Sequence, residues 1–306
     1  MKIAYLILAH KYPCHFKRLV KELESESTQV FAHIDKRVDI QLFKSVDTNQ
    51  VIFLEDRLAT NWGGYKLLLA MIRLLRTALE TDKYDYFQFL SGQDYPIKSN
   101  QEIVDFLVES AGDSYMFSYP LSPEAPKAEV FFKYRFADQI AQLPPAFHKV
   151  GYKFEGLINY LLPERALEDY IPYRGSQWVC LHRDAADYCI NFLDTPEGKR
   201  FLHFFRYSWG SDEVMLPSLL LNSPLANRVK CDPYRLSEAM YAKNLFALHY
   251  IDWDQDRSGP AVFDEDDFEA IRLSKAFFAR KFSEEKSSSL LDRIDLELRQ
   301  ANVPAG

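Results

Sequence analysis

The order of predicted strands and helices in the first third of the chain constrains the fold more than any other sequence feature. Residues 3–9 form one continuous apolar segment, which is typical of a strand buried on both faces of a sheet. Residues 15–24 and 65–80 carry apolar side chains at helical spacing. Further strands are predicted at 29–34, 51–54 and 84–90. This alternation predicts an α/β fold with a mostly parallel central sheet flanked by helices.

The rest of the chain is less regular but also contains predicted strands and helices. Residues 120–172 are rich in Pro, Tyr and Phe and are expected to form long loops with short helices. A strand is predicted at 176–181, and helices at 184–193, 211–221 (bent at Pro217), 266–274 and 287–300. Because neither an internal repeat nor a linker is evident, we expect one domain over 1–306.

Charge and cysteine content exclude several classes of protein. The formal net charge is −7, which disfavours a general nucleic-acid binder, so an anionic ligand would need a local cluster of Lys and Arg. The four cysteines show no Cys-x-x-Cys spacing, and we interpret Cys180 and Cys189 as buried free thiols of a reducing compartment. The apolar N-terminus lacks a signal-peptidase cleavage site, so we interpret it as a core strand rather than a signal peptide. No window of ~20 apolar residues occurs, so no membrane-spanning helix is predicted.

Common cofactor and metal motifs are missing from the sequence. Neither a GxGxxG nor a P-loop follows a predicted strand. Asp-x-Asp pairs occur at Asp252/Asp254, Asp254/Asp256 and Asp264/Asp266, but they lie late in the chain. The last pair precedes a predicted helix, where acidic side chains complement the positive end of the helix dipole. The strand end where a metal pair is expected carries a single carboxylate, Asp94. A lone Asp is a poor complete metal site.

Two local segments allow either a structural or a functional interpretation. Ser211-Asp212-Glu213 suits the first turn of a helix, or it presents one carboxylate to a cleft as a general base. Adjacent helical residues diverge by roughly 100°, so Asp212 and Glu213 do not form a glycosidase pair. Arg280-Lys281 is either a basic helix C-terminus or a phosphate clamp, which Arg257 could join from a loop.

Taken together, segments in one order along the chain resemble the core-2/I-branching β-1,6-N-acetylglucosaminyltransferase family, which includes the peptide O-xylosyltransferases. The segments that carry the resemblance are AYLILAH at 4–10, HIDKR at 33–37, WGGY at 62–65, FLSGQDYPIKSN at 89–100, GSQW at 175–178, SDE at 211–213, YIDW at 250–253 and FARKF at 278–282. The resemblance implies a GT-A-like fold, an inverting reaction on a UDP-sugar co-substrate, and no metal or other cofactor.

The resemblance also implies roles for individual residues. Glu213 matches the general base, and Lys281 matches the lysine that holds the UDP phosphates, whereas Arg257 matches the family's arginine only with a small insertion. Further predicted UDP-binding residues are His10, Asp35 and Trp62. Predicted contacts of the donor or acceptor sugar are Asp94, Gln177, Trp178 and Asp212, although Trp178 equally suits an ordinary core position.

The expected substrates and location follow from the same resemblance. We expect a UDP-sugar donor, with N-acetylglucosamine first and xylose or glucuronic acid as alternatives, and a glycan or lipid-linked saccharide acceptor. Residues 1–110 would form the nucleotide-binding half, 111–285 the acceptor and catalytic half, and 286–306 a C-terminal helix and tail. We expect a bacterial-type cytoplasmic enzyme, peripheral at the inner face of the membrane. A non-catalytic saccharide-binding protein and a glycosidase are the competing hypotheses.

Overall fold

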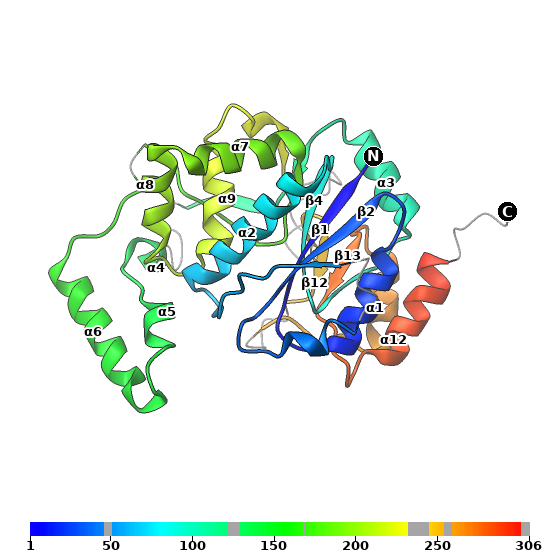
Figure 1. Cartoon of the computed structure of the whole chain (residues 1–306), viewed down its shortest axis with the longest axis horizontal. Coiled ribbons are helices and arrows are strands. Elements are labelled where there is room, and N and C mark those ends of the chain that lie inside the picture. Colours follow the sequence, from blue (N-terminus) through cyan, green and yellow to red (C-terminus); the bar gives the residue numbers. More distant parts are fainter. Residues whose placement is uncertain (46–50, 122–128, 168, 232–244, 254–258, 301–306) are drawn as a thin grey trace.

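The structure is a computed structural model, which describes residues 1–45, 51–121, 129–167, 169–231, 245–253 and 259–300 (Figure 1). Its strands are β1 (Ile3–Ala9), β2 (Thr28–Ile34), β3 (Val51–Phe53), β4 (Tyr86–Ser91), β5 (Asp94–Pro96), β6 (Ser114–Tyr115), β7 (Ser118–Pro120), β8 (Tyr173–Gly175), β9 (Cys180–His182), β10 (Val229–Lys230), β11 (Leu245–Phe246), β12 (His249–Ile251) and β13 (Phe278–Arg280).

The helices surround these strands. They are α1 (Pro13–Leu23), α2 (Tyr65–Thr81), α3 (Asn100–Glu109), α4 (Glu129–Phe132), α5 (Ala137–Ile140), α6 (His148–Leu161), α7 (Arg183–Asp194), α8 (Pro196–Phe205), α9 (Ser211–Leu221), α11 (Phe268–Leu273) and α12 (Ser288–Ile294). Short helical turns cover Ile40–Leu42, Pro145–Phe147, Ala226–Arg228, Glu265–Asp267 and Asp295–Arg299. None of the helices in the described ranges is long and apolar enough to span a membrane.

The central sheet has seven strands in the order β10-β6-β9-β4-β1-β2-β3. The neighbours β4, β1, β2 and β3 are parallel, and only β9 runs against both of its neighbours. The predicted mixed α/β class with a mostly parallel central sheet is therefore confirmed, and β1 matches the predicted strand 3–9. Because strand side chains alternate between faces, Tyr5 and Ile7 join one hydrophobic core while Leu6 and Leu8 join the other.

Helices cover the two faces of this sheet in separate layers. The face that carries Tyr5 packs against α1, α12 and a second sheet, and the opposite face packs against α2, α7 and α9. Figure 1 shows α2, α7 and α9 together on one side of the strands and α1 with α12 on the other. Cys180 and Cys189 are buried free thiols, as predicted.

The second sheet was not predicted from the sequence. It has four strands in the order β11-β12-β13-β5, and Arg280 on β13 lies opposite Asp94 on β5. The interpretation of 277–282 as a helix C-terminus is therefore wrong: this segment is mainly a short buried strand. Its hydrogen bonds to β5 and β12 are long-range pairings that local periodicity does not report.

Two helices depart from the sequence-based expectation. The segment 99–109 was not predicted as a helix, yet Ser99 and Glu102 form a capping box at the start of α3. The irregular middle segment contains α6, which extends over 14 residues rather than one or two turns. Figure 1 shows α6 at the edge of the molecule, far from the central sheet.

Candidate active site

A cavity of about 330 Å³ opens at the carboxyl ends of β1, β2 and β4. This is the sheet edge at which open α/β folds bind ligands. Four residues predicted from the sequence line it: His10, Asp35, Trp62 and Gln177. Arg280, considered from the sequence as part of a phosphate clamp, lines the cavity as well. The wall also contains residues that were not assigned to the site, among them Arg37, Thr60, Asn61, Ser91 and Gln93.

Asp35 is the most heavily hydrogen-bonded group of the cavity wall. Its carboxylate accepts from the backbone and side-chain nitrogens of Arg37 and from the backbone nitrogen and hydroxyl of Thr60, at 2.8–2.9 Å. Burial alone would raise the pKa of Asp35, but these hydrogen bonds outweigh it and hold the pKa below its usual range. Asp35 is therefore a fixed negative charge in the cavity wall. Its partners could have been suspected only from their positions just after predicted strands.

Asp94 lies beneath the cavity rather than in its wall. The side chain is fully buried, and its oxygens accept from the backbone nitrogen and the hydroxyl of Ser91, both at 2.7 Å. The Arg280 guanidinium lies 3.6 Å away and His249 Nε2 3.5 Å away. With no accessible surface, Asp94 does not contact a sugar directly in this conformation. The structure instead gives it a positioning role toward Arg280.

Trp178 also differs from its predicted role as an acceptor wall. Only 7% of its surface is exposed; the Arg280 guanidinium stacks on its ring at 4.0 Å from the centroid, and the His249 ring packs against it at a tilt, 5.5 Å between centroids. The core alternative for Trp178 therefore describes its packing better. Through this stacking, Trp178 and Asp94 together orient Arg280 toward the cavity.

Positive charge gathers at the mouth of the cavity, next to Arg280. Burial, Arg280 and Lys11 together lower the pKa of Lys281. Burial lowers the pKa of His10, and the nearby charges of Lys11 and Lys281 lower it further, against the opposing effect of Asp35. Lys11 directly follows His10 and Lys281 directly follows Arg280, so both lysines adjoin residues of the cavity wall. The local basic cluster that an acidic chain would need for an anionic ligand is thus present.

Asp212 and Glu213 begin α9 and point to different environments, as the helical geometry predicted. Asp212 is buried, and its Oδ1 has no hydrogen-bond partner among the described residues. Glu213 keeps 31% of its side chain exposed and accepts from Arg174 at 3.3 Å. Burial raises the pKa of both carboxyls, while Arg174 opposes the rise for Glu213. Glu213 is thus an accessible carboxylate of elevated basicity.

Arg174 is a site residue that sequence reasoning missed. Its guanidinium donates to Glu213 and lies 5.0 Å from the centroid of the Phe131 ring. Because 39 residues separate Arg174 from Glu213, only the tertiary structure brings them together. A faint signal was available, since Arg174 immediately precedes the GSQW segment at 175–178.

The turn at Trp62 connects the cavity to the start of α9. Gly210 donates a backbone hydrogen bond to Gly63 at 2.9 Å, and the Trp209 ring meets Trp62 edge-on at 5.0 Å between centroids. Gly63 has a φ of +71°, and a Cβ there would lie 2.8 Å from the Trp209 ring, so glycine is required. This contact fixes the segment that precedes Glu213 against a residue of the cavity wall.

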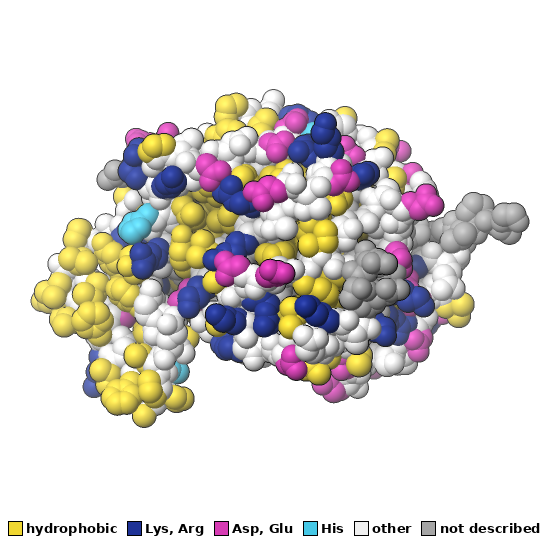
Figure 2. Space-filling model, in the orientation of Figure 1, with side chains coloured by type: hydrophobic (Ala, Val, Ile, Leu, Met, Phe, Trp, Pro, Cys, Tyr) yellow, Lys and Arg dark blue, Asp and Glu magenta, His cyan; other side chains and the backbone are white. Residues whose placement is uncertain are grey.

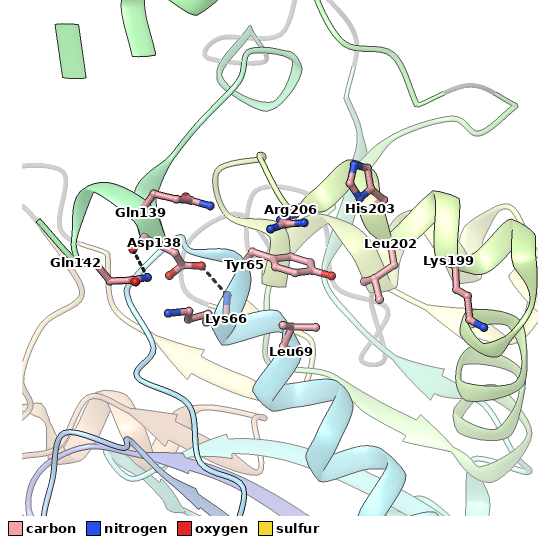
Figure 3. A pocket seen from close by; sticks show the side chains of 10 residues that line it. All are labelled: Tyr65, Lys66, Leu69, Asp138, Gln139, Gln142, Lys199, Leu202, His203 and Arg206. Carbon is pink, nitrogen blue, oxygen red and sulfur yellow. Dashed lines mark hydrogen bonds between the residues drawn. The ribbon is translucent and has the colours of Figure 1, made fainter. Parts of the chain in front are cut away.

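Two further cavities lie beyond Trp62. One of about 240 Å³ is lined by Trp62, Trp209, Tyr152, His148 and other residues, and it shares Asn61 and Trp62 with the cavity at the strand ends. The other, of about 600 Å³, lies between α2, α5 and α8 (Figure 3). There Asp138 accepts from the backbone nitrogen of Lys66 at 2.8 Å and from Asn61 at 3.1 Å. Asn61 and Asp138 therefore link the three cavities along one side of the molecule.

The structure also places the acidic pairs considered as metal ligands. Asp264 caps the turn Glu265–Asp267 and forms a capping box with Asp267, so the helix-start interpretation of that cluster is confirmed. Within the described ranges, no group of three or more His, Cys, Asp or Glu side chains is arranged to hold a metal ion. Arg257, Asp254 and Asp256 lie outside the described residues.

A model of the Core-2/I-Branching enzyme family matches residues 3–276, which include the segments that carry His10, Asp35, Trp62, Gln177 and Glu213. The chain belongs to this family. In the Core-2/I-Branching chain described here, the matched range ends after α11, so it covers α9 with Glu213 but stops before Arg280 and Lys281.

Curated proteins similar to this Core-2/I-Branching chain include several named as xylosyltransferases. The chain is 26% identical over 318 residues to "Xylosyltransferase 2" of Rattus norvegicus, covering 99% of the chain and 34% of that protein. It is 25% identical over 309 residues to "Xylosyltransferase" of Ciona intestinalis, covering 97% of the chain and again 34% of the relative. The chain therefore spans about a third of the length of these relatives.

Solved structures offer only a distant likeness to the Core-2/I-Branching chain. The crystal structure of 4-diphosphocytidyl-2C-methyl-D-erythritol synthase from Anaerococcus prevotii aligns with 9% identity and a TM-score of 0.33, over 74% of this chain and 96% of that one. At such a TM-score the likeness carries no argument about function or mechanism.

Proposed function

We propose that the protein is an inverting glycosyltransferase that moves a sugar from a UDP-sugar to a glycan hydroxyl, with Glu213 as the general base. One observation carries the proposal above all. In a chain of the Core-2/I-Branching family, Glu213 is an accessible carboxylate with a raised pKa at the start of α9, and its segment packs against the wall of a cavity rimmed by cations.

The chemistry proposed for this site is a single displacement. The Glu213 carboxylate takes the proton of the acceptor hydroxyl, the acceptor oxygen bonds to the anomeric carbon, and the bond from that carbon to the phosphate oxygen breaks. UDP leaves with the bonding electron pair and the added negative charge. Attack from the face opposite to the leaving group inverts the anomeric configuration.

Fixed cations are proposed to stabilise the leaving diphosphate. Arg280 lines the cavity and Lys281 is next to it in the chain, which supports this role, because positive charge held in position before the reaction needs no reorganisation when the phosphate charge develops. Arg280 thereby becomes the favoured second cation. The contribution of Arg257 stays a prediction from the family resemblance alone.

The remaining predicted residues are proposed to fall into two groups, those that contact the ligand and those that position other side chains. His10, Asp35 and Trp62 line the cavity and are assigned to the nucleotide, while Gln177 is assigned to the sugar side of the same cavity. Asp94, Asp212 and Trp178 are buried, so we assign them to positioning rather than to direct contact. The neighbouring cavity lined by Trp62, Trp209 and Tyr152 suits an acceptor saccharide, because aromatic faces pack well on sugar rings.

We expect activity without a divalent metal. The test incubates the full chain with UDP-xylose, UDP-N-acetylglucosamine and UDP-glucuronic acid in turn, with candidate glycan acceptors, and measures UDP release with and without EDTA. The expected result is release from one donor at a rate that EDTA leaves unchanged. Complete loss of turnover on chelation would contradict the metal-free mechanism, and failure to bind any UDP-sugar would favour a saccharide-binding protein.

The donor sugar is the open part of the proposal. N-acetylglucosamine follows from the family's branching members, whereas the name xylosyltransferase of the relatives favours xylose. Both donors present the same UDP to the cavity at the strand ends, so they differ only in the sugar beyond the phosphates. Direct comparison of kcat/KM for the two donors distinguishes them.

Replacement of Lys281 by Ala is expected to weaken UDP binding by about 10- to 100-fold, because one charge-assisted hydrogen bond to phosphate is lost. Isothermal titration calorimetry with UDP measures the change. Lys286→Ala is the matched control, because Lys286 is an exposed lysine of the same segment that is not next to a residue of the cavity wall. Equal affinity of both variants and the unmodified chain would remove Lys281 from the phosphate site.

A further inference from the structure

Helix α6 is attached to the rest of the protein by its polar side. The Glu155 carboxylate accepts from Arg135 at 2.9 Å and from the backbone nitrogen of Phe136 at 2.8 Å. The Asn159 side chain pairs with the backbone of Tyr134 in both directions, at 2.7 and 2.9 Å. Glu155 is the one residue of α6 that is buried. The usual orientation of an amphipathic helix, apolar face inward, is thus reversed.

The opposite side of α6 carries a continuous apolar stripe that faces solvent. Val150, Phe154, Leu157 and Leu161 follow one another at helical spacing and are 61%, 57%, 51% and 63% exposed. Figure 2 shows hydrophobic side chains gathered on the projecting part of the molecule where Figure 1 draws α6. We define these four residues as the α6 stripe. Exposed contiguous apolar surface of this kind marks an interaction site.

Charge and aromatic content around the α6 stripe identify the kind of partner. Lys149 and Lys153 are exposed and lie one turn apart beside the stripe, and Tyr160 is exposed on the same flank. The only acid in α6, Glu155, is buried and paired with Arg135, and Glu164 lies beyond the helix end. Apolar residues flanked by lysines and aromatic rings are the pattern of a helix that lies in a membrane interface.

We propose that α6 docks the protein on a lipid bilayer surface that carries anionic headgroups, with the α6 stripe inserted among the acyl chains and Lys149 and Lys153 at the headgroup level. The position of α6 at the edge of the molecule allows shallow insertion without displacing the body of the protein (Figure 1). A symmetric pair of copies fits the surface less well, because it would bring the lysines of both helices together with no exposed acid of α6 to pair with them.

Docking through α6 would also orient the acceptor side of the proposed site, a consequence that rests on the proposed function. His148, Tyr152 and Glu155 on α6 line the cavity that contains Trp62 and Trp209. A bilayer against the α6 stripe would therefore lie near that cavity, where a lipid-linked saccharide could enter. The docking itself does not depend on transferase activity, so its test is independent of turnover.

The test is flotation of the full chain with vesicles of phosphatidylcholine containing one quarter phosphatidylglycerol, and with pure phosphatidylcholine vesicles. The wild-type chain is expected to float with the anionic vesicles. Phe154→Ser/Leu157→Ser should lower its partitioning at least about tenfold, because two inserted apolar side chains are lost. Leu273→Ser/Leu296→Ser is the matched control, since both leucines are highly exposed on other helices, and it should float like wild type.

Charge reversal tests the headgroup contact separately. Lys149→Glu/Lys153→Glu is expected to lower binding to the anionic vesicles by about tenfold or more. Lys17→Glu/Lys21→Glu makes the same change on exposed lysines one turn apart on α1 and should have little effect. Absence of wild-type flotation, or equal flotation of the α6 variants and their controls, would overturn the proposal. A dimer in analytical ultracentrifugation that Phe154→Ser/Leu157→Ser abolishes would assign the stripe to a second copy instead.

Discussion

Replacement of Glu213 by Gln is expected to lower kcat by roughly 10²–10⁴-fold, the range for removing a positioned general base. Gln keeps the size of the side chain and its hydrogen bond with Arg174, but it cannot take the proton of an acceptor hydroxyl. KM for the donor should change little, because Glu213 is not among the residues that line the cavity at the strand ends. Steady-state UDP release with the preferred donor measures both constants.

The control for this variant is Glu269→Gln. Glu269 is also in the first turn of a helix and also pairs with an arginine, Arg272 at 2.7 Å, but it lies on α11 and lines none of the described cavities. Its rate should match wild type. Because burial raises the pKa of Glu213 and the base acts only when deprotonated, kcat/KM should fall as pH drops through that raised pKa. A near-normal rate for Glu213→Gln would remove it from the role of base.

Replacement of Arg280 by Met is expected to lower the free energy of unfolding by about 3–5 kcal/mol at neutral pH, the usual cost of leaving a buried charge without its partner. Met fills a similar volume but leaves the Asp94 carboxylate, which has no exposed surface, without the guanidinium now 3.6 Å away. Chemical denaturation with two spectroscopic probes measures the change. UDP binding should weaken as well, because Arg280 lines the cavity.

A second substitution separates the electrostatic effect from simple loss of packing. Arg280→Met/Asp94→Asn removes both charges and should recover most of the lost stability, whereas Arg272→Met, on an exposed pair, should cost within about 0.5 kcal/mol. Burial alone would raise the pKa of Asp94, but Arg280, together with His249 and Ser91, holds it below its usual value, so the stability these contacts contribute is present above the unfolded pKa and is lost as pH falls. A loss of under about 1 kcal/mol at neutral pH would contradict this role.

The individual site residues show how far sequence reasoning reached. His10, Asp35, Trp62 and Gln177 were predicted and do share one cavity. His10 and Asp35 directly follow predicted strands, whereas Trp62 and Gln177 were predicted from the family resemblance. Asp94 was recognised as part of the region but its burial was not, and a core position for Trp178 was only one of two alternatives, since accessibility depends on what packs above a residue. Asp94 faces Arg280 through a strand pairing that joins segments far apart in the chain.

The sequence by itself determined the α/β class, the buried strand β1, the amphipathic helix α2 and the divergence of Asp212 from Glu213, because each follows from the spacing of side chains along a local strand or helix. Only the tertiary structure decided the second sheet, the pairing of Arg174 with Glu213 and the burial of Asp94. It also decided that α6 turns its polar side inward. These features depend on contacts between distant segments, whose free energy outweighs local preference and leaves no periodic signal in the sequence.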